Sequence, residues 1–203
     1  QRNTHRAELL VNGAAISTAV GESSYIRWSN QHSESSDHFA GLVGLKANDV
    51  LTLRTTPTAQ TAGESFIDTV SLYAELVEGD RNVFSATATA IQSGTNLNVA
   101  PDTGDQNLVW TSTRKGSAYA HSDGDHGITI EGDGNYMVYA NVPLNGSVAR
   151  ASVGLTIALD GEAVEGARGR QGYIRNSNAH TNSSIHYSGM IRAEAGQVLT
   201  VVT

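Results

Sequence analysis

The sequence has no cysteine, so it contains neither a disulfide framework nor a cysteine-based metal site. It has only two lysines, Lys46 and Lys115, and a net charge of −7, which leaves no basic surface for a nucleic acid. No apolar run is long enough to span a bilayer as a helix, so we expect no membrane insertion. The G-x-S-x-G, H-E-x-x-H and phosphate-loop motifs are also missing, and we therefore expect no enzyme.

Proline is scarce, with 3 residues, whereas glycine is abundant, with 21. Short strands joined by tight turns are typical of this composition. Apolar and polar residues alternate along 68–76 and along 83–91, and 126–144 holds two such runs around a glycine-rich turn. No stretch keeps the 3.6-residue period of a helix over three turns. The chain is therefore predicted to be an all-β, antiparallel sandwich.

One long segment occurs twice in the chain. The stretch YIRWSNQHSESSDHFAG (25–41) returns 148 residues later as YIRNSNAHTNSSIHYSG (173–189), with 10 of 17 positions identical and no gap. At the same offset, residues 7–55 correspond to 155–203. The spacing is too long for a solenoid unit and predicts a tandem repeat of a whole domain with its linker.

Each copy contains the same hairpin signal. Asn12-Gly13 lies between two apolar runs, and Asp160-Gly161 lies at the equivalent place in the second copy. Both dipeptides tolerate positive φ angles and favour a two-residue hairpin turn.

The segment from residue 82 onward carries a series of motifs in a fixed order. They are Phe84-Ser85-Ala86, Trp110, Gly116 to Tyr119, Gly134 to Val142, and the Asp160-Gly161 turn. In order and spacing the chain resembles the C1q/TNF-like jelly-roll superfamily over most of 82–203 and, through the repeat, over 7–78. The resemblance implies an antiparallel jelly-roll β-sandwich that is non-enzymatic, extracellular and often trimeric. The Ser-Gly of the family's final strand is absent at the expected place, Val70–Leu76.

This resemblance predicts portions of two tandem copies. Residues 1–80 hold the back portion of a first jelly roll, without its leading strands. Residues 81–203 hold the front portion of a second, without its last strands. Either the sequence is a window on a longer tandem array, or neighbouring molecules supply the missing strands. Open sheet edges favour pairing with another chain. We expect assembly strands at 68–76 and 197–203, with the apolar residues Val70, Leu72, Leu76, Val198, Leu199 and Val201.

Two histidines recur in each copy, as His32 with His38 and His180 with His186. If the residues between them form a five-residue hairpin loop, the two side chains face each other across adjacent strands, about 5 Å apart at Cβ. Such a pair either binds a metal, or repels itself when protonated near pH 6, or only supports the loop. No third ligand is evident in the sequence.

The segment HSDGDHG (121–127) places His121, Asp123, Asp125 and His126 close together. Alternating carboxylates around a glycine are able to coordinate Ca²⁺, although the loop is not an EF-hand. The alternative is a solvated acidic turn. Ca²⁺ is therefore the one candidate cofactor that the sequence offers.

Three further residues are candidates for contacts with a ligand or partner. Trp28 beside Arg27 could stack on a sugar or a protein, and Arg175 belongs to an arginine cluster that could contact an acidic neighbour. Trp28 is equally compatible with a core position, and the arginine cluster with an exposed loop.

Two functions of different classes follow from these features. The first is a structural extracellular protein that binds copies of itself, end to end, into a fibre, sheath or adhesive appendage. The second is a secreted or virion-surface module that binds a glycan or cell-surface receptor, possibly with Ca²⁺, as a closed homotrimer.

Overall fold

The computed structural model describes residues 2–22, 36–61, 70, 72–77, 79, 82–91, 107–145, 153–170, 174 and 181–203. These residues form strands and no helix, and every strand pair with a defined register is antiparallel. The strands are β1 (Arg2–Val11), β2 (Ala14–Glu22), β3 (Leu51–Thr61), β4 (Phe84–Ile91), β5 (Leu108–Lys115), β6 (Tyr119–Ala120), β7 (Ile128–Ile130), β8 (Gly134–Asn145), β9 (Gly154–Leu159), β10 (Glu162–Arg170), β11 (Asn182–Ala193) and β12 (Val198–Val202). The predicted all-β, antiparallel class is confirmed.

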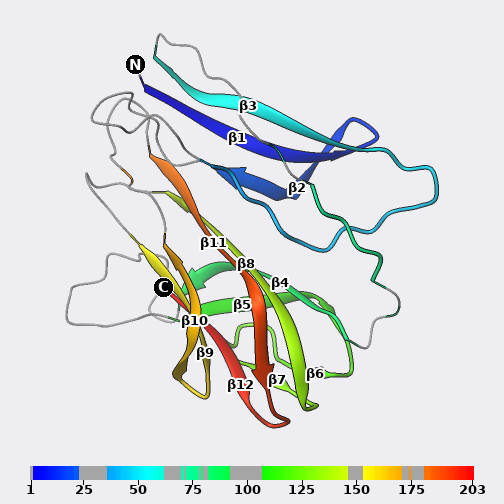
Figure 1. The fold of residues 1–203 in the computed structure, drawn as a ribbon, viewed down its shortest axis with the longest axis vertical. Coiled ribbons are helices and arrows are strands. Elements are labelled where there is room, and N and C mark those ends of the chain that lie inside the picture. The colour runs from blue at the N-terminus through cyan, green and yellow to red at the C-terminus, as the bar shows by residue number, and fades with distance from the viewer. Residues whose placement is uncertain are drawn as a thin grey trace. The chain divides into compact units, whose positions relative to one another are not determined.

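The strands form four sheets (Figure 1). One has three strands in the order β2-β1-β3, and another has five in the order β10-β9-β12-β7-β6. Two smaller sheets pair β11 with β8 and β4 with β5. In the larger two sheets a hairpin (β1–β2 or β9–β10) is extended by a strand from much later in the chain.

The chain divides into two compact units. The first contains 1–78, 141–152 and 171–185, and the second contains 79–140, 153–170 and 186–203. The break near residue 78 lies close to the expected boundary at 80. Two later segments also belong to the first unit, so neither unit is one continuous stretch of chain, and the division into portions of two jelly rolls at 1–80 and 81–203 stays a prediction.

The five-stranded sheet carries the apolar core of the second unit. Ile130, Leu155 and Ile157 have almost no exposed surface. Branched side chains suit the half-buried, pleated surface of a strand, and in β7 the two isoleucines flank a threonine with the period-two alternation expected of such a strand. In the first unit, Leu9 of β1 is the buried counterpart of Ile157.

The segment 68–76 differs from its prediction. Its alternation predicted a half-buried strand, but residues 70 and 72–77 lie outside any strand, and their large apolar side chains are exposed. Alternation makes a segment suitable for pairing, but it does not supply the neighbouring strand.

Candidate functional site

The two copies fold into the same three-stranded module. In the first copy Val11 pairs with Leu51 across β1 and β3. In the second copy, Leu159 pairs with Leu199 across β9 and β12, at the 148-residue offset of the sequence. The strand orders β2-β1-β3 and β10-β9-β12 are therefore equivalent in both pairing and register. The repeat read from the sequence is a repeat of structure.

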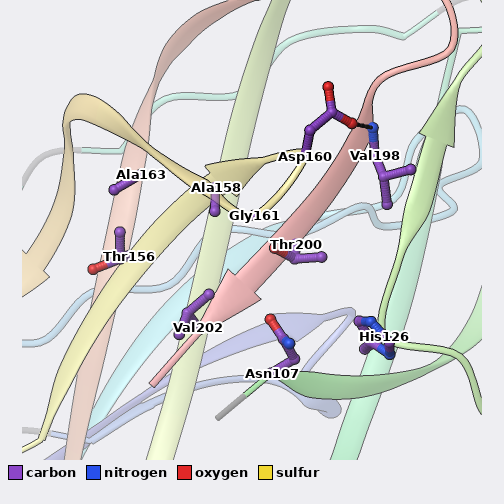
Figure 2. A pocket seen from close by; sticks show the side chains of 10 residues that line it. All are labelled: Asn107, His126, Thr156, Ala158, Asp160, Gly161, Ala163, Val198, Thr200 and Val202. Atoms are coloured by element: carbon purple, nitrogen blue, oxygen red, sulfur yellow. Dashed lines mark hydrogen bonds between the residues drawn. The ribbon is translucent and has the colours of Figure 1, made fainter. Parts of the chain in front are cut away.

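In each module, a side chain of the hairpin turn accepts a hydrogen bond from the backbone at the start of the third strand. Asn12, at φ 51°, accepts a hydrogen bond from the Val50 backbone N–H on its Oδ1 at 2.9 Å. Asp160, also at φ 51°, accepts one from the Val198 N–H at 2.8 Å (Figure 2). In return Val50 and Val198 each accept a bond from the backbone N–H of the turn residue at 2.9 Å. The hairpin turn therefore sets the register of the third strand.

The second module is completed by a further strand on its outer edge. Strand β7 pairs with β12, with Thr129 opposite Val198 and Ile128 opposite Leu199. The Ile130 N–H donates to the Gln197 carbonyl at 2.9 Å, and the Gly196 N–H donates to the Ile130 carbonyl at 2.8 Å. Strand β12 is thus central in its sheet.

This central position corrects one expectation. Val198, Leu199 and Val201 were predicted to form an assembly edge, because the sequence stops within their strand. In the structure β12 has a neighbour on each side, and Leu199 and Val201 are buried. These residues therefore offer no free edge.

The equivalent edge of the first module is open. Among the described residues, β3 pairs only with β1. Leu53 is 41 % exposed, whereas its counterpart Val201 is 4 % exposed. Val50 is 59 % exposed, whereas its counterpart Val198 is half-buried. We call residues 49–56 along this side of β3 the open edge.

The contacts of the hairpin turn show in which direction the backbone N–H and carbonyl groups of the open edge point. Both the N–H and the carbonyl of Val50 face β1, where they bond to Asn12. Since successive residues of an antiparallel strand point to opposite neighbours, Leu51 and Leu53 direct theirs away from β1. By the same alternation Pro57, which has no N–H, faces this side as well. Within a strand, proline is found at an edge or at a bulge, and Pro57 lies beside the register shift between Thr4 and His5.

A second element of the first module also lacks its counterpart's pairing. In the second copy, residues 182–193 form β11, which pairs with β8. The equivalent residues from 36 to 45 are described and contain no strand. Among the described residues, the first module thus contains no counterpart of β7 or of β8.

The remaining assembly residues, Val70, Leu72 and Leu76, are the most exposed apolar group of the described chain, with Leu76 at 81 %. Tyr73 next to them donates a hydrogen bond from its hydroxyl to Glu75 at 3.0 Å. Their exposure agrees with a surface that pairs with something else.

A hollow of about 570 Å³ lies over β9 and β12 of the second module (Figure 2). Small side chains, Ala158 and Thr200, form its floor, while Asn107 and His126 stand at its border. Its polar groups are the Asn107 amide, the hydroxyls of Thr156 and Thr200, the His126 imidazole and the Asp160 carboxylate.

The first module has bulkier side chains at the equivalent positions. Glu8 and Arg54 replace Thr156 and Val202 there, and the Arg54 guanidinium donates to Glu8 Oε2 from Nε at 3.0 Å and from Nη2 at 2.8 Å. Leu10 replaces Ala158. The two modules therefore share a backbone but present different faces.

The predicted calcium loop is held by hydrogen bonds within the protein. Asp123 Oδ1 accepts bonds from the Ser112 N–H at 2.8 Å and from its hydroxyl at 2.7 Å. His121 is buried, with Nδ1 2.8 Å from the Gly127 carbonyl and its ring edge-on to Phe84 at 5.3 Å. Asp125 donates its backbone N–H to Ser122.

The four residues do not form a metal site in this conformation. No group of three or more ligating side chains comes together anywhere in the described chain, and His121, Asp123, Asp125 and His126 all lie within it. One carboxylate is committed to Ser112 and one imidazole faces the interior, so the segment is built as a hydrogen-bonded turn.

The Asp123 turn is expected to loosen in acid. Hydrogen bonds from the Ser112 backbone and hydroxyl hold the pKa of Asp123 below its usual value. A lowered pKa means that the carboxylate stabilises the fold above its usual pKa, and that this contribution is lost as the pH falls through the lowered value. The Ser112 amide resonance should move with the titration of Asp123. In Asp123→Asn it should stay in place, and an equal shift in that variant would contradict the assignment.

Most other candidates lie outside the described residues. These are Arg27, Trp28, His32, Arg175 and His180. His38 is half-buried, and its carbonyl oxygen would lie only 2.5 Å from a Cβ at Gly21 of β2, so the two backbones pack closely there. His186 is exposed over much of its surface, yet partial burial of the ring lowers its pKa. The predicted histidine pairs and the Trp28 contact stay predictions.

Sequence reasoning missed the open edge of β3 and the hollow. Two signals were available. Pro57 inside a strand-like run indicates an edge. Aligning the copies also shows bulky residues of the first, such as Glu8 and Arg54, replaced by small ones in the second.

Comparison with known proteins gives little further information. No family model matches the chain, and no curated protein matches it. A solved structure, the crystal structure of murine APRIL at pH 5.0, is similar over 58 % of this chain and 75 % of its own, with 15 % sequence identity and a TM-score of 0.38. A TM-score this low does not establish a shared fold. No helix of the described residues is long and apolar enough to cross a membrane. The all-β architecture rests on this chain's own strands.

Proposed function

We propose that this chain is a structural protein of the cell exterior whose jelly-roll-like modules associate through strand edges. The product of this association is a fibre, a sheath or an adhesive appendage. One observation carries the proposal: two modules share one register, yet β12 is covered by β7 while the same edge of β3 has no neighbour among the described residues.

An open edge of this length favours association. It presents outward-facing N–H and carbonyl groups at Leu51 and Leu53 beside exposed apolar side chains. Proteins usually protect such edges with charge, short strands or bulges, because another strand pairs with them readily. Here Pro57 limits the edge at one end only.

The apolar segment at 70–77 gives the same indication. Val70, Leu72 and Leu76 are exposed on one stretch of chain that has the alternation of a strand. Exposed apolar residues gathered in this way mark interaction surfaces.

The proposal predicts assembly that depends on the open edge. Light scattering and sedimentation over a range of concentrations should show particles whose size grows with concentration, without added ligand. Leu53→Pro removes one outward N–H and should reduce the particle size strongly, because proline cannot donate to an added strand. Leu53→Val, which keeps the N–H and an apolar side chain, is the matched control.

The opposite result is equally clear. A monodisperse small oligomer at all concentrations, unchanged by Leu53→Pro, would contradict end-to-end assembly. It would favour the alternative of a recognition module for a glycan or protein receptor. The hollow over β9 and β12 is the observation that supports this alternative.

A further inference from the structure

We propose that the open edge of β3 pairs with residues 72–77 of a second copy of this chain. We call these residues the exposed segment. The inference rests on the proposed function, for which it names the two surfaces that meet. The contact is heterologous, because an edge of one copy meets a different part of the next, and such a contact can repeat from copy to copy.

The exposed segment is available for pairing in every copy. Its residues lie in no strand, and Leu72 and Leu76 are 62 % and 81 % exposed. Leu72, Ala74 and Leu76 recur at every second position, so an extended backbone would place them on one face. A second copy can therefore offer this segment without opening any strand pair that the structure describes in it.

The open edge carries an incomplete row of apolar side chains. Leu53 lies opposite Leu9 of β1 and thus on the same face of the sheet. Leu9 is 7 % exposed, whereas Leu53 is 41 % exposed, so burial decreases toward the outer side of β3. A further strand with apolar residues on this face would cover Leu53 and extend the buried row.

The second module shows a cover of this kind. There, β7 runs antiparallel to β12 and sets Ile128 opposite Leu199, the counterpart of Leu51. Ile128 and Ile130 are 4 % and 1 % exposed in this position. An antiparallel strand with apolar residues at every second position is therefore what this type of edge accepts.

One register aligns the apolar residues of the two surfaces. It sets Ala74 opposite Leu53, with the flanking pairs Leu51 with Leu76 and Thr55 with Leu72. On β3 these positions direct their N–H and carbonyl groups away from β1, so all of these pairs are hydrogen-bonded. A shift of two residues in either direction would place a carboxylate, of Asp49 or of Glu78, opposite a leucine.

The backbone angles support the same register. It brings Gly79 opposite Asn48, and these residues have φ angles of 75° and 73°. A positive φ interrupts an extended strand. Both chains would therefore leave the ladder at the same place.

The other face of the pairing brings opposite charges together. Glu75 would face Thr52, which places its carboxylate diagonally across from Arg54. The Arg54 side chain is 52 % exposed and donates to Glu8 through Nε and Nη2. A guanidinium has enough N–H donors for a second carboxylate as well.

The test uses two single-cysteine chains, because the sequence has no cysteine of its own. One carries Thr52→Cys and the other Glu75→Cys, and the apolar row is intact in both. Residues that face each other in this way, without a direct backbone hydrogen bond, have Cα atoms about 4.5 Å apart, within the range of a disulfide. After mixing under mild oxidation, the 52–75 disulfide should form about 10-fold faster than a disulfide between identical chains. Non-reducing gels and peptide mass spectrometry measure the products.

Two comparisons test the register and the burial. Tyr73→Cys in place of Glu75→Cys keeps the face but shifts the position, and should cross-link more slowly. Leu76→Asp, added to the Glu75→Cys chain, should slow the 52–75 reaction about 10-fold or more, because this leucine is buried only in the pairing. Leu45→Asp, at a leucine that is 46 % exposed outside both surfaces, should not slow it. Circular dichroism checks that each variant is folded.

Other products would overturn the inference. A disulfide mainly between two Thr52→Cys chains would mean that two β3 edges meet, and one mainly between two Glu75→Cys chains would mean that two exposed segments meet. In a chain that carries both substitutions, a disulfide formed within one monomer would mean that each copy covers its own edge.

The results separate this inference from the proposed function. If the 52–75 disulfide forms between chains but the particles never grow with concentration, the pairing holds and end-to-end assembly fails. If growing particles form without this disulfide, assembly holds and the pairing is wrong.

Discussion

Ile157→Ala is expected to destabilise the second unit by about 3–4 kcal/mol. Ile157 is fully buried, at 0 % exposure, in the middle of β9, which has a neighbour on each side. Removing its branched side chain loses apolar burial and leaves a cavity that the two flanking strands cannot close. Urea denaturation followed by Trp110 fluorescence, in a Trp28→Phe background, reports on this unit specifically.

The control for this prediction is Met190→Ala. Met190 is 63 % exposed in β11, so its truncation should change the free energy of unfolding by no more than about 0.5 kcal/mol. Similar losses in the two variants would mean that β9 is not the core of the unit.

Asp160→Ala is expected to destabilise the same unit by about 2–3 kcal/mol. The substitution removes the acceptor of the Val198 N–H and of the Gln197 side-chain amide, at 2.8 and 3.2 Å. It also places alanine at φ 51°, where a Cβ without a polar group is strained. Thermal unfolding and exchange of the Val198 amide measure the two consequences.

Two further substitutions separate these causes. Asp160→Asn should be close to the parent, because Asn12 makes the same bond to Val50 in the first module. Asp160→Gly relieves the backbone strain but not the lost hydrogen bonds, so it should fall between alanine and asparagine. If alanine and asparagine behaved alike, the side-chain bond would have no part in setting the strand register.

The local features of the fold could be predicted from the sequence because they depend on neighbouring residues. Asn12-Gly13 and Asp160-Gly161 are hairpin turns with positive φ, as these dipeptides favour. The alternation of 83–91 became β4, and that of 126–144 became β7 and β8. The repeat offset relates residues of the two copies, and in both copies strands that lie 40 residues apart pair in the same register.

Features that depend on distant partners could not be predicted in this way. The alternation at 68–76 resembles that of β4, but only β4 has a neighbouring strand among the described residues. The C-terminal strand looked like an edge because nothing follows it in sequence, whereas β7, some 70 residues earlier, covers it. The acidic residues of HSDGDHG likewise suggested a metal site. The sequence did not reveal that Ser112 of β5 donates two hydrogen bonds to Oδ1 of Asp123.

The bond from each hairpin turn to the third strand leaves the rest of the module free to change. Asn12 and Asp160 each hold the register through one backbone N–H of that strand. Side chains on the paired strands can therefore differ, as Glu8 and Arg54 differ from Thr156 and Val202, while the pairing stays the same. A duplicated module built in this way can diverge in its surface without losing its fold.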